Sequence, residues 1–176
     1  MKGTVMDTIN KRRLAAVFVV AAGSLGTSVA LAAGGSARSS GPDYTYVGGE
    51  AFADATASVH VVHTGNGGTR VSLHILGVDA LAGQTFGAHV HQNPCGVTGA
   101  AAGPHYQDAG ATNALADREV WLDFTVNAAG IGHAEAERTW SLDETTQRSV
   151  IIHALPTAVN GTAGARLACI DLDGRS

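Results

Sequence analysis

Beyond residue 40 the chain shows no long stretch with the period of an α-helix. Short alternating or apolar runs follow one another instead, separated by Gly, Asn and Asp residues of the kind found in turns. The clearest pair of runs, 58–64 and 69–76, flanks the residues Gly-Asn-Gly-Gly at 65–68, which predicts a β-hairpin. This pattern restricts the chain to folds that are built from short strands and tight turns.

Further runs with the length and composition of strands lie at 44–48, 86–91, 119–126, 132–138, 148–153 and 165–172. With the hairpin, they predict an all-β domain, an eight-stranded antiparallel Greek-key barrel or sandwich. The stretch 92–118 carries no strand pattern. A connection of this length is expected to be a functional loop rather than part of the core.

Two histidines, His89 and His91, stand two positions apart within the run 86–91. On a strand, such residues point from the same face, so the pair can bind one metal ion, and His105 and His153 could complete the set. Four imidazoles without a thiolate suit Cu(II), and Zn(II) or Ni(II) less well. Taken alone, the pair leaves open a strand that simply carries two surface histidines.

The N-terminal segment 1–32 has the order of a secretory signal peptide. A basic cluster at 11–13 precedes an apolar run at 14–31, and a small-x-small cleavage site ends at Ala32. A transmembrane anchor is the alternative, although the run is short for a bilayer and contains several Gly, Ser and Thr residues. We expect cleavage after Ala32 and export to the periplasm, cell wall or medium.

Residues 33–43 are rich in Gly and Ser and are expected to form a flexible leader to a single domain at 44–176. The chain has 11 basic and 15 acidic residues, of which the segment 1–32 holds four basic residues and one acidic residue. Cleavage would therefore leave 7 basic and 14 acidic residues. No basic cluster survives, which argues against nucleic acid and against a membrane surface as partners after cleavage. The oligomeric state stays open.

Four segments carry a family resemblance, namely GAHVHQNPC at 87–95, AGPHY at 102–106, SVIIH at 149–153 and GTAGARLAC at 161–169. In this order and at these spacings they resemble the copper/zinc superoxide dismutase family, over roughly residues 44–174. The resemblance implies a superoxide dismutase-like fold, a copper cofactor, and conversion of superoxide to dioxygen and hydrogen peroxide.

The resemblance also implies roles for individual residues. Its copper ligands would be His89, His91, His105 and His153. Arg166 would guide superoxide to the metal. We hypothesise in addition that His105 takes up a proton and delivers it to the nascent peroxide. Cys95 and Cys169 would form the intrachain disulfide, which also fits two cysteines in an oxidising compartment; reduced thiols or thiolate metal ligands are the alternatives.

The chain departs from the family at the zinc site. It has no histidine between His105 and His133, and Val120 stands where the family has the zinc aspartate. Zinc would be left with three carboxylates, those of Asp108, Asp117 and Glu119, which is an unusual ligand set. We therefore expect no zinc.

A second departure is the connection 154–165, which contains no charged residue. In the family, a longer charged loop stands here, with an aspartate that links the surroundings of the copper and zinc sites. Nothing in this connection is expected to make that link. Both departures together resemble exported, copper-only members.

Two other functions remain open. A non-enzymatic, extracytoplasmic copper-binding or buffering protein is favoured by the loss of the charged loop, whereas Arg166 favours the enzyme. A structural domain that binds nothing is disfavoured by the four histidines. Four further histidines fall on expected strands, where solvent-facing side chains are preferred over a second metal site: His60, His63, His74 and His133.

Overall fold

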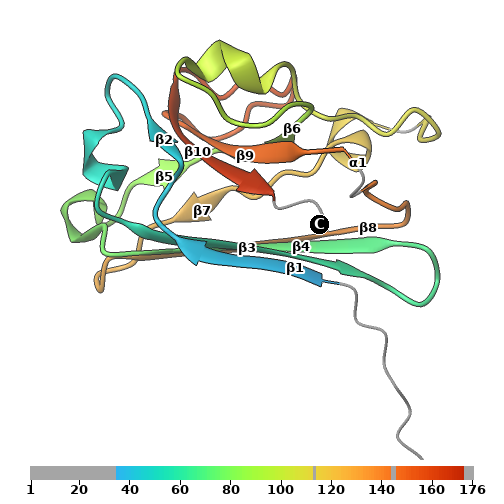
Figure 1. Ribbon diagram of the computed structural model, residues 1–176, viewed down its shortest axis with the longest axis horizontal. Helices are drawn as coiled ribbons and strands as arrows, with labels where there is room; N and C mark the ends of the chain where they lie inside the picture. Colours follow the sequence, from blue (N-terminus) through green and yellow to red (C-terminus); the bar gives the residue numbers. More distant parts are fainter. Residues whose placement is uncertain (1–34, 113, 144–145, 173–176) are drawn as a thin grey trace, which may run out of the picture. The chain divides into compact units, whose positions relative to one another are not determined.

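The structure, a computed structural model, describes residues 35–112, 114–143 and 146–172, so the expected signal peptide at 1–32 lies outside it. Two four-stranded antiparallel sheets face each other (Figure 1). The first sheet has the order β1 (Gly35–Ser40), β3 (Thr56–His63), β4 (Thr69–Leu76) and β8 (Ile131–Arg138). The second has the order β2 (Tyr44–Thr45), β10 (Arg166–Leu172), β9 (Arg148–His153) and β6 (Ala88–His91). A separate short ladder joins β5 (Thr85–Phe86) and β7 (Phe124–Thr125).

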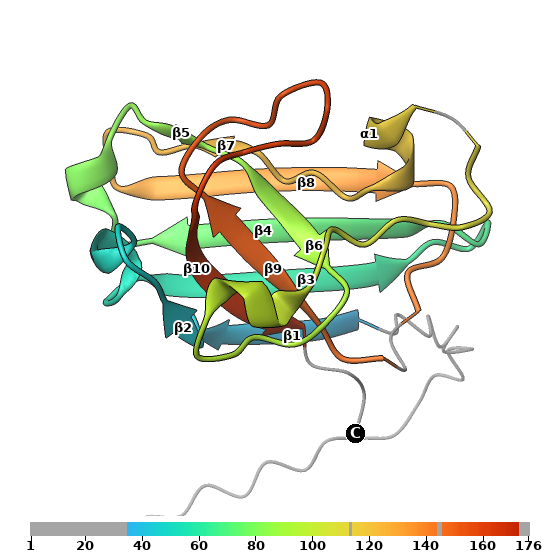
Figure 2. The same ribbon diagram turned by 90° about the horizontal axis from the view of Figure 1, so that it is seen from above.

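The core lies between the two sheets, and strand alternation explains it. In β3 and β4, every second side chain is buried, while the others face solvent. Seen from above, the strands of the second sheet run obliquely across those of the first (Figure 2). β9 is buried at all six positions, because the 3-10 helix η3 (Gly99–Ala102) packs on its other face through Ala102 and Ile151.

The prediction of an all-β antiparallel fold is confirmed, with eight strands in the two main sheets. They are not the eight expected, because the run 119–126 forms a ladder only at β7. The expected alternation of buried side chains still holds, since Val120, Leu122 and Val126 are buried. Residues 120–122 lie beside β6, but isolated backbone hydrogen bonds join them to it in place of a continuous ladder. Gly87 separates β5 from β6, and a Cβ at this position would lie 2.8 Å from the carbonyl oxygen of Leu155.

The remaining strand is β1, which falls inside the expected flexible leader 33–43. It pairs in register with β3, from Gly35 opposite Val62 to Ser40 opposite Ala57. A Gly- and Ser-rich segment can add to a sheet edge because the ladder is made by backbone groups rather than side chains. Residues 35–40 of the expected leader thus form an edge strand in the structure, and the flexibility of the leader stays a prediction.

The stretch 92–118 forms no strand in its described residues, as predicted, and contains η3 and the short helix α1 (Leu115–Arg118). The disulfide Cys95–Cys169 joins it to β10. The backbone N–H of Cys95 also donates to Asp171 Oδ1 at 2.6 Å, and Tyr46 donates its hydroxyl to the carbonyl oxygen of Gly96 at 3.1 Å. These contacts fix the loop against the second sheet. Among the described residues, no helix has the length and apolarity that a membrane crossing requires.

Replacing both cysteines, Cys95→Ala with Cys169→Ala, is expected to lower the free energy of unfolding by about 3–5 kcal/mol. The disulfide joins residues 74 positions apart and thereby restricts the conformations of the unfolded chain. Its removal raises the entropy of the unfolded state and so favours unfolding. Denaturant unfolding of the double variant against the oxidised parent measures the difference. A loss below about 1 kcal/mol would contradict a constraint on this loop.

Candidate metal centre

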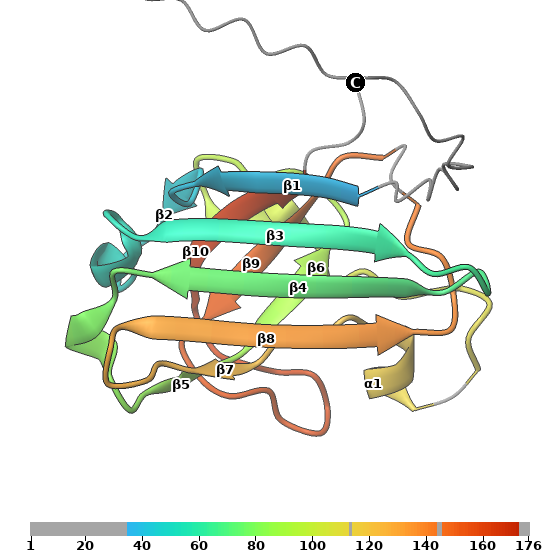
Figure 3. The same ribbon diagram turned by 90° about the horizontal axis from the view of Figure 1, so that it is seen from below.

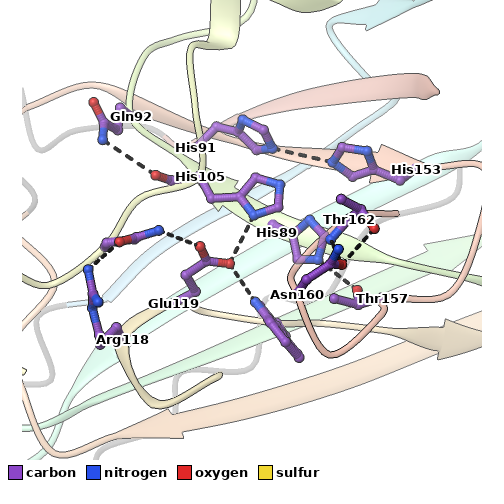
Figure 4. A network of polar contacts seen from close by, with 12 residues as sticks. His89, His91, Gln92, His105, Arg118, Glu119, His153, Thr157, Asn160 and Thr162 are labelled. Carbon is purple, nitrogen blue, oxygen red and sulfur yellow. Dashed lines mark hydrogen bonds and ion pairs between the residues drawn. The ribbon is translucent and has the colours of Figure 1, made fainter. Parts of the chain in front are cut away.

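Four imidazoles meet at one end of β6. His89 and His91 belong to β6, His153 ends the neighbouring strand β9, and His105 lies on the loop, where it forms a backbone bridge with His91 (Figure 4). One ring nitrogen of each residue lies within 4.8 Å of the corresponding nitrogens of the other three. His89, His91 and His153 are buried, whereas the side chain of His105 is 18% exposed. The cluster expected from the sequence is thus assembled.

Backbone carbonyls determine which ring nitrogen of His91 and His153 faces the centre. Nδ1 of His91 lies 2.9 Å from the carbonyl oxygen of Gly103, and Nδ1 of His153 lies 3.3 Å from that of Gly164. A carbonyl oxygen only accepts, so Nδ1 carries the proton in both rings and Nε2 keeps its lone pair. These two Nε2 atoms lie 3.3 Å apart.

His89 is held the opposite way round, through Thr157 and Asp123. The hydroxyl of Thr157 donates to Asp123 Oδ2 at 2.6 Å, and Oδ1 accepts the backbone N–H of Thr157 at 2.7 Å. The hydroxyl oxygen is therefore free to accept from Nε2 of His89, 2.7 Å away. That bond leaves the lone pair of His89 on Nδ1, which is buried and has no partner in the described part of the chain.

His105 is held by a buried carboxylate. Its Nδ1 donates to Glu119 Oε2 at 2.9 Å, and Glu119 also accepts from Trp121 Nε1 at 2.6 Å and Gln107 Nε2 at 2.8 Å. Burial acts to raise the pKa of Glu119, but these hydrogen bonds outweigh it and leave the pKa below its ordinary value. Glu119 is consequently ionised at neutral pH, and Nε2 of His105 keeps the lone pair.

These contacts leave four lone pairs for one ion, on Nδ1 of His89 and on Nε2 of the other three histidines. Burial, the largest cause in each case, lowers the pKa to about 2 for His89, about 3 for His91 and about 4 for His153. The three rings are therefore neutral, which is the form that binds metals. An orphaned buried nitrogen within an all-imidazole set fits copper well.

Arg166, expected to guide an anion, lies beside this cluster at the start of β10. Its Nη2 donates to the carbonyl oxygen of Gly103 at 2.6 Å, and its Nη1 donates to that of Gly99. Gly103 therefore receives hydrogen bonds from both Arg166 and His91. Together with His105 and His153, Arg166 lines an open cavity of about 590 Å³. The cavity gives a small solute access to the cluster.

Two features of the centre were not predicted. The connection 154–165 was expected to provide no aspartate that links the two metal surroundings, yet its Thr157 connects the carboxylate of Asp123 to His89 by hydrogen bonds. Glu119 was considered only as an oxygen ligand for zinc, whereas it binds His105. No spacing signal reveals either contact, because Asp123 and Thr157 are 34 residues apart and meet only in the folded chain.

The family model for copper/zinc superoxide dismutase (SODC) matches residues 55–170. The match covers more than half of the 176 residues, and the chain belongs to the copper/zinc superoxide dismutase family. The family resemblance drawn from the four sequence segments is thereby confirmed. A search of curated proteins finds no matching sequence.

Solved structures include similar chains at low sequence identity. The clock protein EA4 has a TM-score of 0.53 and 19% identity, over 69% of this chain and 88% of that chain. A double mutant of a superoxide dismutase-like protein from Bacillus subtilis has a TM-score of 0.48 and 18% identity, over 67% and 89%. The Cu(II) form of Candida albicans superoxide dismutase 5 has a TM-score of 0.47 and 19% identity, over 81% and 92%. The similarity to EA4 shows a shared fold.

The Thr157→Val variant is expected to weaken copper binding about 10- to 100-fold, because loss of the hydroxyl removes the acceptor that holds His89. Competition against a calibrated copper chelator measures the dissociation constant. Thr162→Val is the matched control, since the Thr162 hydroxyl donates to Asn160 and not to a histidine. Equal copper affinity in Thr157→Val and Thr162→Val would contradict the role of the Asp123–Thr157 pair.

Proposed function

We propose that this chain is an exported, copper-dependent superoxide dismutase that converts superoxide to dioxygen and hydrogen peroxide without zinc. Family membership, the four converging imidazoles and Arg166 support the activity. The observation that carries the zinc-free part is the hydrogen bond between His105 Nδ1 and Glu119. In zinc-containing members, the histidine at this position bridges both metals. Here its outer nitrogen carries a proton that it donates to a carboxylate.

The surroundings of His105 also argue against zinc. Val120, at the position of the zinc aspartate, is fully buried in the apolar core. Glu119 already accepts three hydrogen bonds, from His105, Trp121 and Gln107. A zinc ion at this position would have to displace the His105 bond and would gain no second imidazole.

Copper bound by the four histidines would supply the redox chemistry, accepting an electron from one superoxide and passing it to a second. The chain supplies the attraction for the anion. Acidic residues outnumber basic ones in the domain, and the guanidinium of Arg166 places a local positive charge at the cavity. Its bonds to Gly99 and Gly103 hold it in place, so it can bind the anion without first having to be ordered.

Formation of hydrogen peroxide consumes protons, and His105 is placed to deliver one. It is the most exposed of the four site histidines and lines the open cavity, so its ring can exchange protons with water. Glu119 holds the ring through Nδ1, so Nε2 is the atom that would take up and release the proton once it is no longer bound to the ion. The ionised carboxylate stabilises the imidazolium while the proton is held.

Export is supported by the disulfide Cys95–Cys169, since such bonds persist in oxidising compartments. A second candidate function, a copper-binding or buffering protein, is favoured by one observation. The connection 154–165 forms part of the cavity wall through residues 160–164 and carries no charged side chain. Such a wall adds no long-range attraction for an anion, so the test must measure turnover as well as binding.

Replacing Arg166 by Gln or Glu is expected to lower kcat/KM for superoxide by about tenfold or more, with the larger loss for Glu, because the local attraction is removed or reversed. Pulse radiolysis or stopped-flow decay, normalised to bound copper, measures the rate. Arg70→Gln is the control, since Arg70 and its partners Glu135 and Glu137 all lie on the first sheet, whereas Arg166 lies on the second. Unchanged turnover in Arg166→Glu would overturn the role of Arg166.

A further inference from the structure

Three histidines that the buried centre does not use gather on the outer face of the first sheet. His74 on β4 pairs directly opposite His133 on β8, and His60 on β3 lies diagonally across from His74. The ring centroids of His74 and His133 lie 4.2 Å apart, and those of His60 and His74 lie 6.4 Å apart. All three residues are exposed. Figure 3 looks onto this face, where β3, β4 and β8 run side by side.

We infer that His60, His74 and His133 form a second metal site, open to solvent, for a divalent transition ion that prefers imidazole. Directly opposed residues of an antiparallel pair hold their Cβ atoms about 4.5–5.5 Å apart, which allows two imidazoles to bind one ion. His60, on the diagonal, adds a third imidazole once the side chains turn toward one another, because in the structure the three rings do not yet offer nitrogens that all lie within 4.8 Å of one another. Cu²⁺ is the ion such a set binds most tightly, ahead of Ni²⁺ and Zn²⁺.

A hydrogen bond to a backbone carbonyl, as in the buried centre, fixes which ring nitrogen of His133 is available to a metal. His133 Nδ1 lies 3.2 Å from the carbonyl oxygen of Leu73. Because the carbonyl can only accept, the proton stays on Nδ1 and the lone pair of His133 is on Nε2. The bond therefore presets the ligand atom of His133 before any ion arrives.

The charge around the three rings also suits a cation. Glu135 follows His133 by two positions on the same face of β8, and its carboxylate accepts a hydrogen bond from Ser72 at 3.3 Å. Arg70 lies 3.3 Å from the same carboxylate and 2.7 Å from that of Glu137, so two acids share one base here. The immediate surroundings of the site are therefore net negative.

The rings of His74 and His133 are tilted by only 32°, so they lie nearly stacked rather than converging on one point. Binding requires rotation about their side-chain torsions, which exposed residues sample readily. We therefore expect weaker and faster-exchanging binding than in the buried centre. The site belongs to the opposite sheet from the buried centre and is independent of dismutase activity.

His63 provides a matched control within the same sheet. It also lies on β3, but at the end paired with Thr69, and the Ser141 hydroxyl lies 3.2 Å from its Nδ1. It has no ring contact with the other three histidines among the contacts of the described residues. Its substitution removes one surface imidazole without touching the proposed site.

The experiment is a titration of the untagged full chain with Cu²⁺, supplied as a weak glycine complex. Bound copper is measured by equilibrium dialysis, and its surroundings by electron paramagnetic resonance. The parent protein is expected to bind a second, weaker equivalent with its own spectrum. His74→Gln, and separately His133→Gln, should weaken that equivalent about tenfold or more. Neither variant should change the first equivalent, which thereby reports correct folding.

His63→Gln is expected to bind both equivalents as the parent does. Absence of a second equivalent in the parent would overturn the proposal, as would its retention in both His74→Gln and His133→Gln. A loss equal to theirs in His63→Gln would also overturn it, because the binding would then be a general property of surface histidines. If the parent bound only the weaker equivalent and lacked the tighter one, the buried copper centre would be refuted and the surface site would not.

Discussion

Each of the four imidazoles in the buried centre has its outer nitrogen held by a hydrogen bond, and the whole site depends on these bonds. Backbone carbonyls hold His91 and His153, Thr157 holds His89, and Glu119 holds His105. Without them each ring could present either nitrogen, and the lone pairs would not converge. The loops around the two sheets bring these partners together, and the disulfide to β10 fixes one of the loops.

Glu119 connects the fold to the proposed chemistry. A carboxylate that is 2% exposed is costly to bury, and three hydrogen-bond donors offset that cost. Its charge orients His105, and in the proposed reaction it would stabilise the protonated ring, whereas in zinc-containing members the outer nitrogen of this histidine binds the second metal instead. In the proposed function, Arg166 would supply the positive charge that attracts the anion, since it lines the cavity beside the four histidines.

Local patterns allowed much of this structure to be predicted. Strand alternation placed β3, β4, β8, β9 and β10 within one or two residues, and the i, i+2 spacing of His89 and His91 placed both on one strand. What could not be predicted depends on long-range pairing. The pairing of β1 is made by the backbone alone, Asp123 meets Thr157 across 34 residues, and the cluster around His74 requires the register of three strands.

The most direct test of the central claim is the rate of superoxide decay per bound copper, for protein loaded with copper alone and then given zinc. We expect fast catalytic decay that zinc leaves unchanged, because Glu119 already holds the outer nitrogen of His105. A rate that rises on zinc addition would contradict the zinc-free site. Tight copper binding with decay no faster than in the copper-free protein would contradict the enzyme and leave a copper-binding protein.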